Sequence, residues 1–139
     1  IAIVADYVLQ SECPGASEYC ELRVAAGLSP RSREAAELGL PHSLFAVSLR
    51  LDGQLVGMGR VIGDGGCNFE VVDIAVHPEH QGKGLGTRIM QSIMQWIDEN
   101  VPPTAYVCLL ADDDAPKLYS KFGFVLTAPK TVGMALKRQ

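Results

Sequence analysis

Three glycines at alternate positions, Gly82, Gly84 and Gly86, separate an apolar run from an amphipathic one, and this junction limits the folds that the chain can adopt. The apolar run at 71–76 indicates a buried strand. The run at 85–97 repeats large apolar residues at helical spacing and keeps polar residues opposite them. The sequence therefore predicts a strand, a glycine-rich turn and a helix in direct succession.

This turn predicts a binding site for a phosphate or pyrophosphate group. Its glycines leave backbone N–H groups unshielded at the N-terminus of the helix, where the helix dipole is positive, and Lys83 can add a charge. The spacing differs from the G-x-G-x-x-G of dinucleotide-binding folds, and the chain contains no P-loop motif. An alternative is that the glycines serve only close packing of the helix on the strand.

Two motifs resemble those of the GNAT superfamily of N-acetyltransferases. One, similar to the acyl-CoA-binding motif, is Gln81-x-x-Gly84-x-Gly86 after Val76-His77-Pro78. The other, similar to the second GNAT signature, is Ala115-x-x-Leu118-Tyr119-x-x-Phe122-Gly123-Phe124. The resemblance implies a single domain over residues 1–139 of the α/β (α+β) class. Its central sheet would be mixed and mostly antiparallel, with about six to seven strands flanked by about four helices.

Periodicity and turn residues place the individual elements. The Asp52-Gly53 pair predicts a hairpin, and Ser29-Pro30 predicts the start of a short helix. The last two strands before the C-terminal region should be parallel, because a helix connects them. We expect strands over 1–9, 43–51, 54–62, 68–76, 104–111 and 131–137, and helices over 16–26, 30–38, 85–100 and 115–122.

Composition excludes several classes of partner. The chain has 139 residues and a net charge of −4 with scattered basic residues, which argues against a nucleic-acid partner. The apolar stretch at 1–4 is too short to span a membrane or to form a signal sequence, so no membrane partner is expected. The four cysteines have no zinc-site spacing, so we expect reduced thiols, no metal site and a cytoplasmic protein.

The resemblance implies where acetyl-CoA would lie and which group would act as the acid. Backbone groups of the central strand would bind the pantetheine, and the glycine-rich turn would hold the pyrophosphate. Tyr119 matches the tyrosine that protonates the departing thiolate, although it could instead be a packing aromatic. Asp112 stands where relatives often carry an asparagine that contacts the cofactor. The cofactor-binding residues implied are Ile74, Ala75, Val76, Gln81, Gly82, Lys83, Gly84, Leu85, Gly86, Thr87 and Asp112.

Acetyl transfer to an amine also needs a base, because a free amine has a pKa of about 10. Two acids in the central strand, Glu70 and Asp73, are candidates. On a regular strand they face opposite sides, so both can reach one site only if a bulge intervenes. We predict Glu70 as the base or water relay, with Asp73 second. Asp73 could instead grip the acceptor or pair with Arg60, which is itself either an acceptor-side residue or that partner.

These features together predict an acetyl-CoA-dependent N-acetyltransferase. It would transfer the acetyl group to a primary amine, expected to belong to a small molecule, by direct attack in a ternary complex. The alternative from another class is a non-catalytic CoA-binding regulatory module with the same fold. A homodimer is possible, because many GNAT proteins dimerise.

Overall fold

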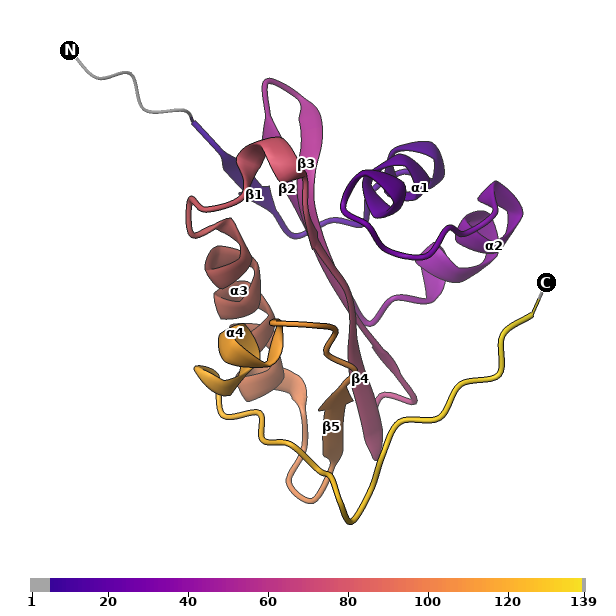
Figure 1. Cartoon of the computed structure of the whole chain (residues 1–139), viewed down its shortest axis with the longest axis vertical. Helices are drawn as coiled ribbons and strands as arrows, with labels where there is room; N and C mark the ends of the chain where they lie inside the picture. Colours follow the sequence, from indigo (N-terminus) through magenta and orange to yellow (C-terminus); the bar gives the residue numbers. More distant parts are fainter. Residues whose placement is uncertain (1–5, 139) are drawn as a thin grey trace.

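A computed structural model describes residues 6–138 and contains one five-stranded sheet in the order β1-β2-β3-β4-β5 (Figure 1). Each strand from β1 to β4 is antiparallel to the next within that set, and β4 and β5 are parallel, as the connecting helix predicts. The mixed class of the fold is thus confirmed, with five strands in place of the six to seven expected. The strands are β1 (Val8–Gln10), β2 (Phe45–Leu51), β3 (Gln54–Gly63), β4 (Asn68–Val76) and β5 (Tyr106–Leu109).

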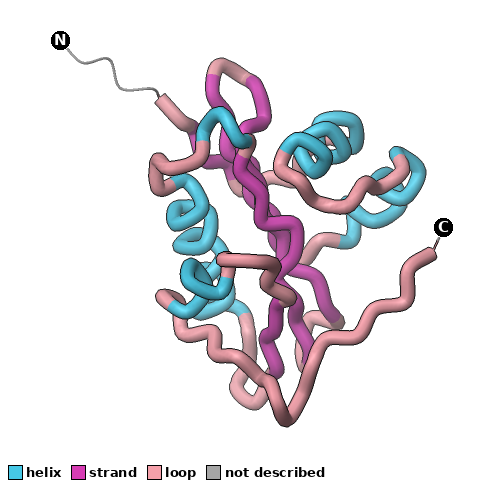
Figure 2. Tube along the Cα trace, viewed as in Figure 1, coloured by secondary structure: helices cyan, strands magenta, loops and turns pink. Residues whose placement is uncertain are grey.

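Helices cover both faces of the sheet. Figure 2 shows the sheet nearly edge-on, with α1 (Ala16–Ala25) and α2 (Arg33–Gly39) on one face. The other face carries α3 (Leu85–Asn100) and the short α4 (Pro116–Ser120). Two 3-10 turns, at Leu40–His42 and Pro78–His80, lead into β2 and into the glycine-rich turn. No helix in this part of the chain is both long and apolar enough to cross a membrane.

The predicted helix after the glycines packs on the sheet through its apolar stripe. Ile89 and Ile93 of α3 are fully buried against β2, β3 and β4. Gly59 of β3 makes this close approach possible, because a Cβ there would lie within 3 Å of side-chain atoms of Ile74, Ile89 and Ile93. The position of the glycine-rich turn is therefore fixed by the packing of α3 on the centre of the sheet.

The start of α2 differs from the prediction. Ser32, rather than Ser29, caps this helix, and its side chain accepts a hydrogen bond from the N–H of Ala35 at 3.0 Å. Ser29 instead bonds Arg23, whose Nε donates to the Ser29 carbonyl at 2.8 Å. The helix therefore begins three residues later than predicted, at Arg33.

A β-bulge interrupts β4 at Asp73. Val72 pairs with Arg60 and Ala75 with Met58, so β4 carries one more residue than β3 over this stretch. Asp73 has φ of +58°, in the left-handed region that aspartate tolerates better than most residues. The bulge directs Asp73 toward α1, whereas Ile74 and Val76 pack on the α3 side. Glu70 and Asp73 therefore face the same side of the sheet, which a regular strand would not allow.

The predicted strand at 131–137 is wrong. These residues lie outside the sheet and are exposed, and the C-terminal segment runs away from β5 toward the side of α2 (Figure 1). Alternating residues favour an extended backbone, but they do not specify which strand it pairs with. Of the predicted strand at 1–9, the structure shows β1 at Val8–Gln10, which starts and ends later than predicted, while residues 6 and 7 are not in the strand and residues 1–5 lie outside the described part.

Candidate active site

A cavity of about 580 Å³ lies where β4 and β5 diverge. Their pairing ends at Val71 and Leu109, while β4 continues to Val76. The cavity is closed by the turn before α3 and by the loop before α4. Its lining residues are Ile74, Ala75, Val76, His80, Gln81, Gly82, Gly84, Leu85, Gly86, Thr87, Asp112, Asp113, Asp114, Ala115, Leu118 and Tyr119. The structure therefore brings together the predicted strand end, the glycine-rich turn and Tyr119.

The glycine-rich turn has the backbone geometry of an anion site. Gly82 and Gly84 have φ of +78° and +76°, values that favour glycine whatever the space around them. Gly84 is the N-cap of α3, so the N–H groups of the next three residues have no partner within the helix. Gln81 ties the turn to β4, because its side-chain amide donates to the Val76 carbonyl at 3.0 Å.

Lys83 does not line this cavity. Its ammonium lies 3.3 Å from the hydroxyl of Tyr7 and 5.8 Å from the centre of that ring. The Tyr7 hydroxyl also lies 2.8 Å from Nδ1 of His80. The structure thus places this predicted cofactor-binding lysine at the outer side of the turn.

The end of β4 has one open edge. Ala75 and Val76 pair with β3 on one side, and in the described part of the chain no strand pairs with residues 74–76 on the other. An extended ligand can add to such an edge through main-chain hydrogen bonds. The cavity thus combines an open strand edge at one end with unpaired helix N–H groups at the other.

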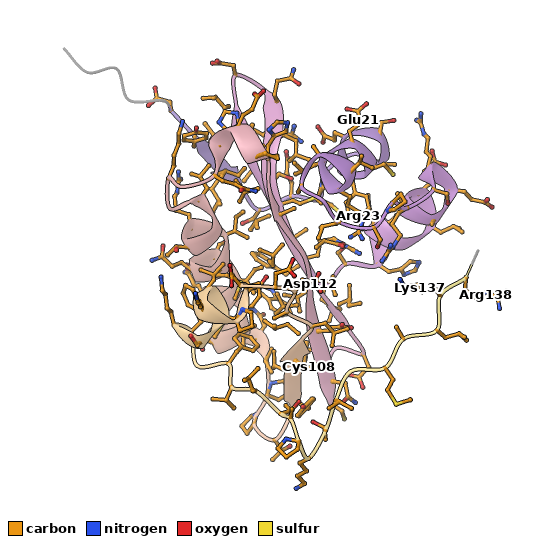
Figure 3. All side chains as sticks on the ribbon, in the orientation of Figure 1. Glu21, Arg23, Cys108, Asp112, Lys137 and Arg138 are labelled. Carbon is orange, nitrogen blue, oxygen red and sulfur yellow. The ribbon has the colours of Figure 1, made fainter. Side chains whose placement is uncertain are left out.

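Tyr119 of α4 is buried in the wall of this cavity. Burial raises the pKa of its phenol, and the negative charge of nearby Asp112 raises that pKa further. The phenol therefore stays protonated through the neutral range, as a proton donor must. Figure 3 shows Asp112 in the loop between β5, which carries Cys108, and α4.

Asp73 is enclosed by three donors. Its Oδ2 accepts hydrogen bonds from Tyr19 and from Nε of Arg60, both at 2.8 Å, and its Oδ1 accepts one from Arg23 at 2.5 Å. The Asp73 side chain is only 7% exposed. Of the two roles left open for Arg60, the structure shows the ion pair with Asp73. Arg23 and Tyr19 of α1 were not foreseen as partners of Asp73. The signal available in the sequence was an arginine at helical spacing from Tyr19, on the same buried side of α1 as Leu22.

Glu70 has a different environment from Asp73. It is half-buried on β4, opposite Ile62 of β3 and Cys108 of β5, and no cation forms an ion pair with it anywhere in residues 6–138. Burial and the charge of Glu70 both raise the pKa of the Cys108 thiol. Glu70 lies just before the two strands diverge, outside the residues that line the cavity. Its carboxylate is therefore available, whereas that of Asp73 is already engaged.

Comparison with known proteins identifies the family. Residues 42–126, more than half of the chain, match the family described as acetyltransferase (GNAT) domain. The chain belongs to the GNAT acetyltransferase family. This GNAT domain is 30% identical over 114 residues to the uncharacterized N-acetyltransferase ycf52 of Porphyra purpurea, covering 79% of the chain but 64% of that protein. It is 29% identical to serotonin N-acetyltransferase 2 of Oryza sativa subsp. japonica, covering 85% of the chain and 60% of that protein.

Solved structures agree with this assignment. A crystal structure from meticillin-resistant Staphylococcus aureus, described as a protein of unknown function and "probable acetyltransferase", is 48% identical to the GNAT domain, with a TM-score of 0.93 over 96% of this chain and 100% of that one. A GNAT acetyltransferase from Brucella melitensis in complex with acetyl-CoA shares the fold, with 19% identity and a TM-score of 0.63 over 88% and 85% of the two chains.

Proposed function

We propose that this GNAT domain transfers the acetyl group of acetyl-CoA to a primary amine of a small molecule, by direct attack within a ternary complex. The observation that carries the proposal is the single cavity that joins the open edge of β4, the N-terminus of α3 and the protonated phenol of Tyr119. In an extended anionic thioester, the chain of amides would use the strand edge, the phosphates would use the helix N-terminus, and the thiol leaving group would use the phenol. The volume of about 580 Å³ is typical of cofactor sites.

The cofactor would lie along the whole length of this cavity. Its pyrophosphate would accept hydrogen bonds from the N–H groups that follow Gly84, where the helix dipole also favours negative charge. The pantetheine would lie along residues 74–76 like an added strand and would form hydrogen bonds with their backbone groups. Asp112 and its two acidic neighbours line the same cavity and repel phosphates, so we expect them to face the acceptor or the solvent.

Two side chains would handle the protons. Glu70 would take the proton of the attacking amine, directly or through a water, since no cation neutralises it among residues 6–138. Tyr119 would return a proton to the departing thiolate. A strand N–H within residues 74–76 would donate to the thioester oxygen as charge develops on it. Asp73 would hold α1 on the sheet, because both of its carboxylate oxygens already accept hydrogen bonds, from Tyr19, Arg23 and Arg60.

An assay of CoA release over a panel of primary amines tests this function. Cys13 and Cys67 are free and exposed, so a protein-only blank must be subtracted when a thiol reagent detects the released CoA. Tyr119→Phe should lower kcat by roughly 10- to 100-fold, as expected for loss of one general acid, with little change in KM for acetyl-CoA. The matched control is Tyr106→Phe, which removes an exposed phenol on β5. Retained kcat in Tyr119→Phe would assign the phenol to packing.

The base is tested by pH. Glu70→Gln should reduce kcat/KM most at low pH, where the amine is mostly protonated, and much less at high pH. The control is Glu21→Gln, which changes an exposed acid on α1 (Figure 3). A chain that binds CoA but releases no thiol with any amine would instead be the non-catalytic regulatory module.

A further inference from the structure

The cluster around Asp73 carries more positive than negative charge. The guanidinium groups of Arg23 and Arg60 both pair with this one carboxylate, and the side chains of Arg23, Arg60 and Asp73 are 5%, 11% and 7% exposed. Tyr19 adds no negative charge, because burial raises the pKa of its phenol and the charge of Asp73 raises that pKa further. A charge removed from water is costly unless it is paired. Within residues 6–138, the cluster is therefore one negative charge short.

The unused donors of this cluster belong to Arg60. Its Nε donates to Asp73 and its Nη1 to the Ser43 hydroxyl, both at 2.8 Å, and its Nη2 has no acceptor in the described chain. No fully enclosed side-chain nitrogen or oxygen of residues 6–138 lacks a partner, so this Nη2 reaches the surface of the cluster. In Arg23, by contrast, Nε, Nη1 and Nη2 all donate to Ser29 or Asp73.

The guanidinium of Arg60 is held in one orientation. Its Cζ lies 5.7 Å from the centre of the Tyr19 ring, and the Ser43 hydroxyl that accepts from Nη1 donates in turn to the Leu40 carbonyl at 2.8 Å. A planar guanidinium fixed in this way offers its remaining N–H groups to an oxyanion. The missing charge is one unit, which a carboxylate supplies, whereas a phosphate monoester would bring about two.

Arg60 shares one face of the sheet with Glu70. Arg60 of β3 pairs with Val72 of β4, Ile62 pairs with Glu70, and residues two apart on a strand share a face. Diagonal neighbours of this kind lie about 7–8 Å apart, within reach of long side chains. Nevertheless, the two side chains form no ion pair in the part of the chain that the structure describes. This face therefore offers an unpaired carboxylate and unused guanidinium donors close together.

We propose that the acceptor is an amino acid, whose carboxylate binds Arg60 while its amine meets Glu70. This inference rests on the acetyl transfer proposed above. The two charges of an amino acid complement the two unpaired groups of this face, and few bonds separate them. The amine nitrogen then bonds the acetyl carbon as the C–S bond breaks. Glu70 takes the proton of the nitrogen, and Tyr119 supplies one to the sulfur.

Matched acceptors test the proposal in the assay of CoA release. Each L-amino acid is compared with its primary amide, which keeps the amine and removes the negative charge. The amino acid should react with a kcat/KM about 10- to 100-fold higher, the effect expected of hydrogen bonds between charged groups. The amide has the more acidic ammonium and therefore more free amine at neutral pH, which favours the amide. Amides that react as well as the amino acids would overturn the proposal.

Arg60→Lys separates binding of the acceptor from stability of the cluster. Lysine keeps the positive charge beside Asp73 but lacks the planar set of donors. The kcat/KM for amino acids should fall about tenfold or more, with that for the amides nearly unchanged. Arg50→Lys is the matched control, because Arg50 is a poorly exposed arginine of β2 that pairs with Glu18 through two hydrogen bonds. A role of Arg60 in folding alone would lower both values equally, and the proposal would fail.

Inhibition of the wild-type chain tests the carboxylate site even if Arg60→Lys does not fold. The carboxylic acid that lacks only the amine of the best acceptor should compete with that acceptor, and its neutral amide should not. Equal inhibition by both compounds, or by neither, contradicts the site. CoA release with neutral amines alone would overturn this inference and leave the proposed acetyl transfer standing. No release with any amine would overturn both.

Discussion

Replacing Asp73 by asparagine separates a structural carboxylate from a catalytic one. Asparagine keeps the shape of the side chain and tolerates the left-handed φ of +58°, so the bulge itself remains available. Alanine would add a backbone penalty of about 1–2 kcal/mol at this φ and would confuse the result. The substitution therefore tests the charge of Asp73 and its three hydrogen bonds, and little else.

The magnitude follows from the donors around Asp73. An asparagine side chain has one carbonyl oxygen and one NH2 group in place of the two carboxylate oxygens. The orientation that keeps more hydrogen bonds places the oxygen where Tyr19 and Arg60 donate and the NH2 group against Arg23. This loses one hydrogen bond between charged groups, about 1.5–3 kcal/mol, and leaves two buried guanidinium groups without a counter-charge. Breaking a buried ion pair typically costs about 3–5 kcal/mol, so we expect the free energy of unfolding to fall by that amount.

Thermal and urea unfolding measure this loss, and a chain of this size should show a Tm lower by about 10–20 °C. Asp98→Asn, which changes an exposed acid at the end of α3, is the control and should melt like the wild type. At temperatures where Asp73→Asn is folded, its kcat/KM should keep the pH profile of the wild type. Wild-type stability combined with a pH-dependent loss of activity would refute the reasoning and make Asp73 the base.

Three further substitutions test the turn, the sheet and an ion pair. Gly86→Ala, at an ordinary helical position, should leave the free energy of unfolding unchanged or raise it by up to about 1 kcal/mol, yet weaken CoA binding by calorimetry at least about tenfold. Gly59→Ala should lower the free energy of unfolding, measured in urea, by about 1–3 kcal/mol, because its new Cβ has no room. Gly66→Ala, in a turn with open space around it, is the control and should not show this loss. Glu18→Gln should be less stable than the wild type at pH 7, because the hydrogen bond from Arg50 lowers the pKa of Glu18. Measured by urea unfolding, the difference in stability between the variant and the wild type should disappear as the pH falls below about 4.5 and then past the lowered pKa of Glu18.

The sequence predicted those parts of the fold whose signals are local. The hairpin at Asp52-Gly53 is confirmed, with φ of +50° and +78° at its two turn residues. The succession of β4, glycine-rich turn and α3 is confirmed because alternation, glycine and helical spacing each act within a few residues. The cavity could be placed for the same reason, since most of its lining comes from the strand end and the turn that follows it.

The parts that were missed depend on contacts between distant residues. The left-handed conformation of Asp73 is stabilised by Tyr19 and Arg23, which precede it by 54 and 50 positions. Ser32 rather than Ser29 caps α2, and the carbonyl of Ser29 accepts a hydrogen bond from the same Arg23. Spacing along the chain cannot identify Tyr19 and Arg23 as partners of Asp73, because both lie in α1, which reaches β4 only when it packs on the sheet.

This bulge connects α1 to the cavity. Before it, β3 and β4 pair in one register, and after it β4 is one residue ahead. The extra residue reverses which backbone groups of residues 74–76 point toward β3 and which toward the open edge. Hydrogen bonds from Tyr19 and Arg23 hold Asp73, where the bulge lies, in place. The set of N–H and carbonyl groups presented to the cavity therefore depends on α1, although α1 contributes no residue to its lining.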